Sequence, residues 1–325
     1  MSETMSALVK PEPGDADLEL REVPIPEIGP EEVRIRIAAC GICGSDLHMR
    51  DGTHPCDPPV VLGHEFAGTV DAVGADVDEF AVGDRVGYRR SWNPFPGVDA
   101  DGGFAAYMRA PASALWTLPD DIGFAEATQF ETVKGPMTWV HETAALEPGE
   151  RVVVSGPGPI GLLVANVARM AGASSVVVLG TEADEAVRLP AALEMGADEA
   201  LVFGDEALSR IAADPPAVWF EASGAAPAVE AAVDHVAPGG RVICNALGNG
   251  PWDVDMRRVA YESIDIRGRW GGDSDTLPDA VDAMRAGDLR VDRVVSHTLP
   301  LSEWERAFEM LERKEGIKIL LDPSQ

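Results

Sequence analysis

The sequence predicts a two-domain α/β protein, in which a compact β-barrel domain accompanies a domain built on a doubly wound parallel sheet. Residues 1–90 contain short apolar or alternating runs separated by Pro and Gly, a texture typical of a β domain. From about residue 131, short apolar runs instead alternate with helix-like stretches. At 325 residues, the chain is long enough to bury two such cores.

The first domain is expected to consist of strands, with no helix of any length in residues 1–90. Its predicted strands cover residues 18–23, 33–39, 66–73 and 86–88. Residues 91–103 hold two prolines and three glycines and are expected to form a loop. The aromatic residues of that loop either fill the core or line a substrate pocket.

The second domain should begin with a strand at residues 151–155, whose continuous apolar character is typical of a strand buried on both faces. Further strands are predicted at 175–179, 199–203, 217–221 and 241–246, and helices at 162–171, 183–195 and 226–236. A helix at 302–313 and a strand at 317–321 are expected to return to the first domain. The predicted domains are therefore 1–132 with 297–325, and 133–296.

The net charge limits the partners of the protein. There are 55 acidic and 26 basic residues, which gives a charge of −29. Such a surface repels nucleic acids and anionic membranes, so neither is expected as a partner. The acidic excess favours a protein adapted to high salt, although a GC-rich genome is an alternative explanation. No apolar run approaches a membrane span, no secretory signal is evident, and the four cysteines form no disulfide framework, so a cytoplasmic location is expected.

A glycine-rich segment follows the strand at 151–155 and opens a helix, which is the context expected of a dinucleotide-binding loop. The first glycine permits the tight turn, the second lets a pyrophosphate approach, and the third packs helix on strand. The alternative is a turn without a ligand. The expected cofactor-binding residues of this loop are Gly156, Gly158, Pro159, Ile160 and Gly161.

The second strand of this domain favours NADP over NAD. NAD sites usually end that strand with a carboxylate that holds the ribose 2′-hydroxyl. Here the strand ends in Gly180-Thr181, and Glu182 follows. Without a carboxylate at the expected position a 2′-phosphate is not repelled, and Thr181 and Arg188 are its predicted partners. NAD remains the alternative.

A Cys-x-x-Cys pair, Cys40 and Cys43, lies close in sequence to Gly63-His64-Glu65. The pair alone is compatible with a redox site or with half of a structural zinc site. The absence of a second such pair disfavours the latter, and the β context disfavours a thioredoxin-like site. A catalytic zinc site needs only three protein ligands. Cys43 and His64 are the strongest candidates, and the third ligand must come from elsewhere.

The stretches C-G-I-C-G-S-D-L-H, G-H-E-F-A-G and G-P-G-P-I-G resemble the zinc-dependent medium-chain alcohol and polyol dehydrogenases, along essentially the whole chain. The resemblance implies a GroES-like barrel and a Rossmann domain. It implies that Cys43 and His64 bind catalytic zinc, with a third ligand just before the nucleotide domain. Glu131 stands there, 25 residues before Gly156. A Cys/His/Glu set resembles the sorbitol, glucose and threonine dehydrogenase branch, which implies a secondary alcohol, polyol or sugar substrate.

The same resemblance assigns roles to the neighbouring polar residues. Glu65 corresponds to a carboxylate able to approach zinc as water leaves, which keeps it open as the third ligand. Asp46 corresponds to the carboxylate that orients the ligand histidine, although it is also suited to capping a helix. Ser45 and His48 correspond to a relay that carries the alcohol proton to solvent; alternatively, His48 is a solvated polar residue.

One departure from the family concerns the lobe that often carries four cysteines and a structural zinc. The loop at 91–103 contains no cysteine, so one catalytic zinc per subunit is expected. The resemblance implies a homo-oligomer. Because the lobe often contributes to subunit contacts, its absence puts the family's tetramer in doubt and leaves the choice between dimer and tetramer open. Two other functions remain open: a zinc-free quinone or enoyl reductase of the same fold, and a non-catalytic nucleotide-binding protein.

Overall fold

The computed structural model describes residues 3–15, 17–90, 92–246, 248 and 250–324. The chain divides into two compact units. The first comprises Met1–Thr132, Val295–Glu312 and Lys318–Gln325, and the second Val133–Val294 and Arg313–Ile317. Among the described residues, no helix combines the length and apolar character needed to cross a membrane.

The first unit is built from two sheets around a common core. One sheet has the strand order β2-β1-β4, and the other has the order β15-β16-β3-β5-β6-β8, with β7 also paired to β3. Its strands are β1 Thr4–Lys10, β2 Glu19–Pro24, β3 Glu32–Gly41, β4 Val60–Val61, β5 Glu65–Val73, β6 Arg85–Tyr88, β7 Tyr107–Pro111, β8 Leu115–Thr117, β15 Val295–Pro300 and β16 Lys318–Asp322. Along β3, Val33, Ile35 and Ile37 are buried at alternate positions and face the core.

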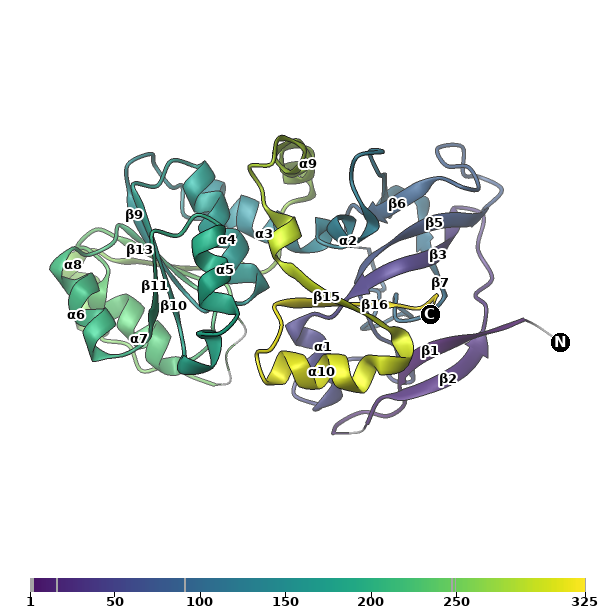
Figure 1. The fold of residues 1–325 in the computed structure, drawn as a ribbon, viewed down its shortest axis with the longest axis horizontal. Helices are drawn as coiled ribbons and strands as arrows, with labels where there is room; N and C mark the ends of the chain where they lie inside the picture. The colour runs from purple at the N-terminus through teal and green to yellow at the C-terminus, as the bar shows by residue number, and fades with distance from the viewer. Residues whose placement is uncertain (1–2, 16, 91, 247, 249, 325) are drawn as a thin grey trace. The chain divides into compact units, whose positions relative to one another are not determined.

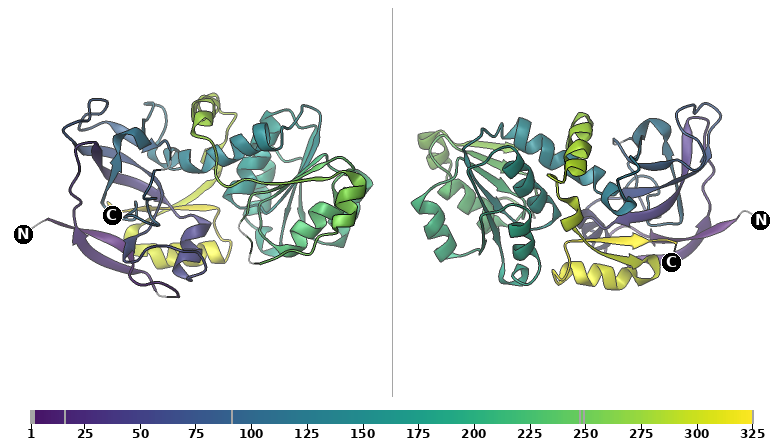
Figure 2. Two further views of the ribbon diagram at one scale, coloured as in Figure 1. Left: turned by 180° about the vertical axis from the view of Figure 1, so that it is seen from behind. Right: turned by 45° about the horizontal axis from the view of Figure 1, so that its top comes forward.

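The last strand of the chain completes the sheet of the first unit. β16 pairs antiparallel with β3, through Leu320 opposite Gly41 and Leu321 opposite Cys40, and parallel with β15. Both views in Figure 2 show these yellow C-terminal strands beside the purple N-terminal ones. The C-terminal segment therefore reaches the strand that leads into the Cys40–Cys43 stretch.

The prediction that residues 1–90 contain no helix is wrong at one place. Helix α1, Gly44–Arg50, starts directly after Cys43. It forms because Asp46 reaches back to accept a hydrogen bond from the Cys43 N–H, which would otherwise lack a partner. The other helical segments of the first unit are α2 Phe124–Ala127, α10 Trp304–Glu312 and the 3₁₀ turns η1 Ala112–Ala114 and η6 Leu301–Glu303.

The second unit confirms the predicted doubly wound sheet. Its strands are parallel in the order β11-β10-β9-β12-β13-β14. Helices α4 and α5 cover one face, and α6, α7 and α8 cover the other (Figure 1). The strands are β9 Arg151–Ser155, β10 Ser175–Gly180, β11 Glu199–Val202, β12 Val218–Glu221, β13 Arg241–Cys244 and β14 Asp265–Gly268. The helical segments are α4 Pro159–Met170, η3 Glu182–Asp184, α5 Arg188–Glu194, α6 Asp205–Ala213, α7 Ala226–His235, α8 Met256–Glu262, η4 Ser274–Thr276, α9 Leu277–Ala286 and η5 Val291–Arg293. A further helix, α3 Phe130–Thr138, continues into the π-helical turn η2 Trp139–Thr143 and spans the boundary between the units.

The helix predicted at 183–195 is instead divided into η3 and α5. The N–H and hydroxyl of Thr181 both donate to the Asp184 carboxylate, at 2.8 and 2.7 Å, which closes the short turn η3. Pro190 lies in the first turn of α5, where its missing N–H does not cost a hydrogen bond. The Asp184 carboxylate is therefore held at the end of β10, a position that matters for the cofactor.

The loop at 91–103 uses its aromatic residues in two ways, while its first residue, Ser91, lies outside the described residues. Trp92 packs against Phe66 and Tyr88, with ring centroids 6.2 and 6.1 Å apart, and so extends the core. Phe95 lies instead against His64, with centroids 5.7 Å apart. One of these aromatic residues therefore fills the core, and the other contacts a predicted metal ligand.

Candidate metal and nucleotide sites

The first unit brings Cys43, His64 and Glu65 to one point. Cys43 is the residue before α1, His64 precedes β5, and Glu65 is the first residue of that strand. One ligand atom from each lies within 4.8 Å of the others, and His64 and Glu65 are buried. This group arises because β3 and β5 pair with Gly41 opposite Glu65, which sets the start of one strand beside the end of the other.

Glu131, the predicted third ligand, lies outside that group of three. Its side chain is half-buried in the first turn of α3, and its charge contributes to raising the pKa of His64. Glu131 therefore lies in the electrostatic neighbourhood of the site. Its predicted role as a ligand stays a prediction.

The Glu65 carboxylate has two partners that the sequence did not reveal. The Lys318 ammonium donates to Oε1 at 2.6 Å, and the Thr132 hydroxyl donates to the same oxygen at 3.2 Å. Lys318 also donates to the Ile42 carbonyl at 3.1 Å, directly before Cys43. One feature of the sequence could have predicted the contact with Lys318. This lysine lies inside the apolar run Ile317–Leu321, and a buried ammonium needs a buried partner.

Asp46 performs the helix-capping role and also faces His64, the predicted ligand. Its Oδ2 accepts from the Cys43 N–H at 2.8 Å, while its Oδ1 lies 4.0 Å from Nδ1 of His64. Oδ1 of Asp46, Nδ1 of His64 and Oε2 of Glu65 are buried without a hydrogen-bond partner among the described residues. Buried polar atoms of this kind require an explanation, and a bound cation supplies one for the carboxylate.

The electrostatics of the cluster favour a positive charge. Burial alone lowers the pKa of His64, but Cys43, Asp46 and Glu131 raise it more, to about 10. Burial raises the pKa of Asp46 to about 6, although His64 and the Cys43 N–H oppose this shift. These neighbouring groups therefore stabilise a proton on the His64 imidazole, and the same negative charges favour a bound divalent cation.

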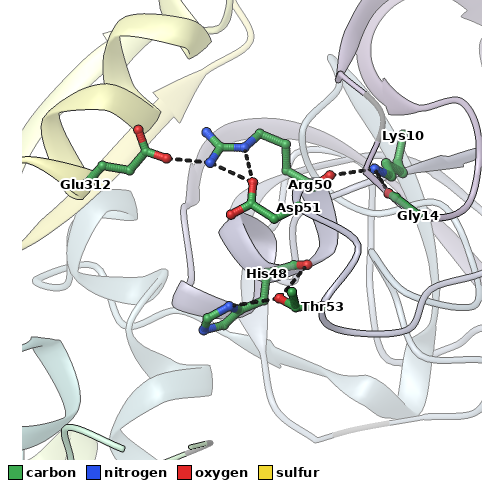
Figure 3. Close-up of polar contacts among 7 residues, drawn as sticks. All are labelled: Lys10, Gly14, His48, Arg50, Asp51, Thr53 and Glu312. Atoms are coloured by element: carbon green, nitrogen blue, oxygen red, sulfur yellow. Dashed lines mark hydrogen bonds and ion pairs between the residues drawn. The ribbon is translucent and has the colours of Figure 1, made fainter. Parts of the chain in front are cut away.

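The predicted relay residues lie on α1, with Ser45 in its first turn and His48 in its second half. Figure 3 shows the His48 ring beside Thr53, whose Oγ1 lies 3.2 Å from Nδ1. The Thr53 hydroxyl also lies 3.3 Å from the His48 carbonyl, to which it can donate its proton while it accepts from Nδ1. In the tautomer that carries its proton on Nδ1, Nε2 of His48 is the acceptor nitrogen.

The far end of α1 is held by charged side chains. Arg50 pairs with Asp51 and with Glu312 at the end of α10, and the buried Lys10 ammonium donates to the carbonyls of Gly14 and Arg50 at 2.7 and 2.6 Å (Figure 3). These contacts place positive charges at the C-terminal end of α1, where they interact favourably with the helix dipole. They fix the helix that carries Ser45 and His48.

In the second unit, the glycine loop joins β9 to α4. Gly156 has φ +95°, a conformation that requires glycine, and a Cβ on Gly158 would meet nothing within 4 Å. Pro159 is the first residue of α4, followed by Ile160 and Gly161, as the predicted loop requires. Gly156 and Gly158 line a cavity of about 410 Å³, so the open backbone surface faces the space that a pyrophosphate needs.

The same cavity is lined by the end of β10. Gly180, Thr181, Asp184, Arg188 and Lys314 all contribute to its wall. Lys314 donates to Thr181 Oγ1 at 2.8 Å and to Asp184 Oδ2 at 2.9 Å. Arg188 donates through Nε to the Gly316 carbonyl at 3.0 Å. Gly156, Gly158, Gly180, Thr181 and Arg188 thus line one cavity, while Pro159, Ile160 and Gly161 are not among its lining residues, and Lys314 is an additional cation that the sequence did not place there. Their role in binding the cofactor stays a prediction.

Comparison with known proteins gives the same division of the chain. Residues 29–120 match the alcohol dehydrogenase GroES-like domain, and residues 159–286 match the zinc-binding dehydrogenase domain. Sorbitol dehydrogenase from Gallus gallus is 34% identical over 342 residues, which cover 95% of this chain and 94% of that protein.

Two solved structures are similar over almost their whole length. A putative zinc-binding dehydrogenase from Sinorhizobium meliloti 1021 bound to NADP has a TM-score of 0.88 and 26% identity, and covers 99% of this chain and 100% of its own. An alcohol dehydrogenase from Escherichia coli CFT073 complexed with NADH has a TM-score of 0.87 and 26% identity, and covers 98% and 99%.

These matches confirm the predicted fold class, a GroES-like domain joined to a Rossmann domain. The similarity to the sorbitol dehydrogenase extends along nearly the whole of both chains, so it includes both units and not one shared module. The chain belongs to the zinc-type medium-chain alcohol and polyol dehydrogenase family.

Proposed function

We propose that this dehydrogenase oxidises a secondary hydroxyl group of a polyol or sugar and transfers the hydride to NADP in preference to NAD. Alcohol or polyol oxidoreduction with a nicotinamide cofactor follows from the family. The finer substrate class is supported by the sorbitol dehydrogenase relative and by the carboxylate in the metal cluster. The observation that carries the proposal is the convergence of Cys43, His64 and Glu65 within 4.8 Å.

The residues of this cluster fit one zinc ion. A thiol, an imidazole and a carboxylate are ordinary zinc ligands, and a set of three leaves a position open. The buried Oε2 of Glu65, which lacks a hydrogen-bond partner among the described residues, is the kind of atom that a cation satisfies. When bound, zinc supplies Lewis acidity, which lowers the pKa of an alcohol.

The protein's own groups would arrange the ligands. Asp46 lies near Nδ1 of His64 and is placed to orient the imidazole. Lys318 and Thr132 hold Oε1 of Glu65 and leave Oε2 for the metal. We favour Glu65 as the third ligand because of this geometry, and Glu131 stays the alternative.

Ser45 and His48 are proposed to move the substrate proton. In this proposal, Ser45 accepts the proton of the substrate hydroxyl and gives up its own hydroxyl proton towards His48, and His48 passes a proton to solvent through Nε2. The Thr53 contact supports that role, because Nδ1 can donate to the Thr53 hydroxyl and leave Nε2 as the acceptor. The position of both residues on one short helix supports a common task.

The preference for NADP is supported by the state of Asp184. A carboxylate does lie near the end of β10, but its side chain is only 1% exposed. Its Oδ2 already accepts from Thr181 and Lys314. It is therefore poorly placed to accept from a ribose 2′-hydroxyl, while Thr181 is exposed. Gly180 and Arg188 complete the proposed binding residues at this edge.

The surroundings of the enzyme are also part of the proposal. The charge of −29 supports a protein adapted to high salt, and four free cysteines support a reducing, cytoplasmic location.

A homo-oligomer, either a dimer or a tetramer, is supported by β14, which ends the parallel sheet and carries the 41%-exposed Ile266. Light scattering in concentrated KCl tests the oligomeric state, and a monomer would contradict it.

The experiment is a panel of secondary alcohols, polyols and aldoses, assayed with NADP and NAD in high salt, together with elemental analysis. We expect one zinc ion per chain, and a higher kcat/KM with NADP. Cys43→Ser should remove zinc and activity while cofactor binding persists. Activity independent of zinc would favour a quinone or enoyl reductase, and no alcohol-dependent reduction would favour a non-catalytic protein.

A further inference from the structure

Lys314 has an unusual backbone conformation. Its φ is +58°, in the left-handed region that glycine adopts easily and a long side chain does not. It lies two residues after the end of α10, at a place where helices commonly use glycine to turn away. A strained residue of this kind is a reason to ask what its side chain does.

The side chain reaches the edge of the nucleotide cavity. Its ammonium is held between Thr181 Oγ1 and Asp184 Oδ2, at 2.8 and 2.9 Å. The side chain remains 30% exposed, and it lines the same cavity as Gly156 and Gly158. The end of the second strand is where the ribose of a dinucleotide lies when its pyrophosphate sits on the glycine loop.

The neighbouring groups fix this ammonium in place. The Asp184 carboxylate is buried and serves as its counter-ion, which lowers the pKa of Asp184. Arg188 holds the short segment that carries Lys314, because its Nε donates to the Gly316 carbonyl at 3.0 Å. Its own side chain is only 13% exposed, so Lys314 presents the more accessible positive charge.

We propose that Lys314 is the residue that selects for a 2′-phosphate on the adenosine ribose, with Asp184 and Arg188 as positioning residues. The inference rests on the proposed preference for NADP and assigns it to one side chain. An ammonium held at the ribose edge can donate to a phosphate oxygen and form an ion pair with it, whereas a 2′-hydroxyl offers an acceptor without negative charge.

The test measures binding without turnover, with the full chain and two probes. Adenosine 2′,5′-bisphosphate and adenosine 5′-monophosphate differ only in the 2′-phosphate. Isothermal titration should show the bisphosphate binding more tightly, by about 10- to 100-fold. Lys314→Met should remove most of that ratio and leave the Kd of the monophosphate unchanged, and Lys314→Arg should retain much of it.

Two further variants complete the design. Arg293→Met removes an exposed cation of the same unit that is absent from the lining of this cavity, so it should leave the ratio unchanged. If Lys314→Met fails to fold because Asp184 loses its counter-ion, the double variant with Asp184→Asn removes both charges and should show the same loss of ratio. A melting curve of each variant confirms that the folded protein is compared.

The outcomes separate the two proposals. If the wild-type protein prefers the bisphosphate and Lys314→Met keeps that preference, the role of Lys314 is overturned and the preference for NADP stands. If the wild-type protein does not distinguish the probes, the preference for NADP fails, and the role of Lys314 fails with it. If Arg293→Met loses the ratio as well, general electrostatics explain the effect and the role of Lys314 is again overturned.

Discussion

Replacing Lys318 with Met should destabilise the first unit by breaking a buried ion pair. The side chains of Lys318 and Glu65 are 2% and 1% exposed, and the ammonium and carboxylate lie 2.6 Å apart. Loss of one partner leaves a charged or newly protonated carboxyl in the core. Removing one member of a buried pair typically costs about 3–5 kcal/mol, so Lys318→Met should lower the free energy of unfolding by that amount.

The assay is urea unfolding followed by tryptophan fluorescence, with the metal chelated. The double variant Lys318→Met with Glu65→Gln should recover much of the loss, because no charge is then left unpaired. Arg306→Met breaks an exposed pair with Glu303 and serves as the control, with an expected loss below about 1 kcal/mol. A loss below about 1 kcal/mol for Lys318→Met, or additive effects in the double variant, would refute the reasoning.

Zinc makes this prediction specific to the proposed site. If Glu65 Oε2 faces the metal, a bound cation provides a second counter-charge for the carboxylate. The loss caused by Lys318→Met should then be smaller in the zinc-loaded protein than in the chelated one. An equal loss in both states would show that Glu65 and the metal do not interact.

Three further predictions concern metal, proton transfer and packing. The pKa of His64 is raised to about 10, so the stability that its protonation contributes is present below pH 6.5 and is lost as pH rises towards 10. The pKa of Asp46 is raised from 3.8 to about 6, so the stability that its protonation contributes is lost as pH rises from 3.8 to about 6 and adds no change above that pH. Because zinc requires a neutral imidazole, the Tm difference between zinc-loaded and chelated protein should widen from pH 6 to 9 in thermal scans, and a constant difference would contradict this. Thr53→Val should lower kcat about threefold to tenfold without changing the KM of the cofactor, because Nδ1 of His48 loses its hydrogen-bond partner. Steady-state assays measure this effect, and an unchanged kcat would show that Thr53 does not contribute to proton transfer. Trp92→Ala should lower the free energy of unfolding by about 2 kcal/mol in urea titrations, because the half-buried ring packs on Phe66 and Tyr88. A change below about 0.5 kcal/mol would show that Trp92 does not belong to the core.

The doubly wound sheet could be predicted from the sequence because its signals are local. The strand β9 was predicted with the bounds it has, since its three consecutive valines form an apolar run typical of a strand buried on both faces. The glycine loop was equally readable, because turn, strand end and helix start are adjacent in the chain. Helix α1 was missed because its seven residues hold few apolar positions and depend on the cap that Asp46 provides.

The candidate metal site was only partly readable, because its partners are distant in the sequence. The motifs around Cys43 and His64 predicted two ligands, which the structure brings close together, but not the orientation of the carboxylate beside them. That orientation is set by Thr132 and Lys318, and the pairing of β16 with β3 brings Lys318 to Glu65. Pairing between strands so far apart leaves no short-range pattern, and only the charged residue within an apolar run marked the place.

The position of Lys318 also links the architecture to the chemistry. A carboxylate buried at 1% exposure is unfavourable alone, and a lysine supplied by the last strand makes it tolerable before any metal arrives. Because Lys318 binds Oε1 and not Oε2, it neutralises Glu65 and leaves Oε2, the oxygen proposed to bind metal, without a hydrogen-bond partner among the described residues. Its second hydrogen bond, to the Ile42 carbonyl, ties the same ammonium to the segment that presents Cys43. Closing the sheet with β16 therefore completes the fold and orients two of the proposed ligands in one step.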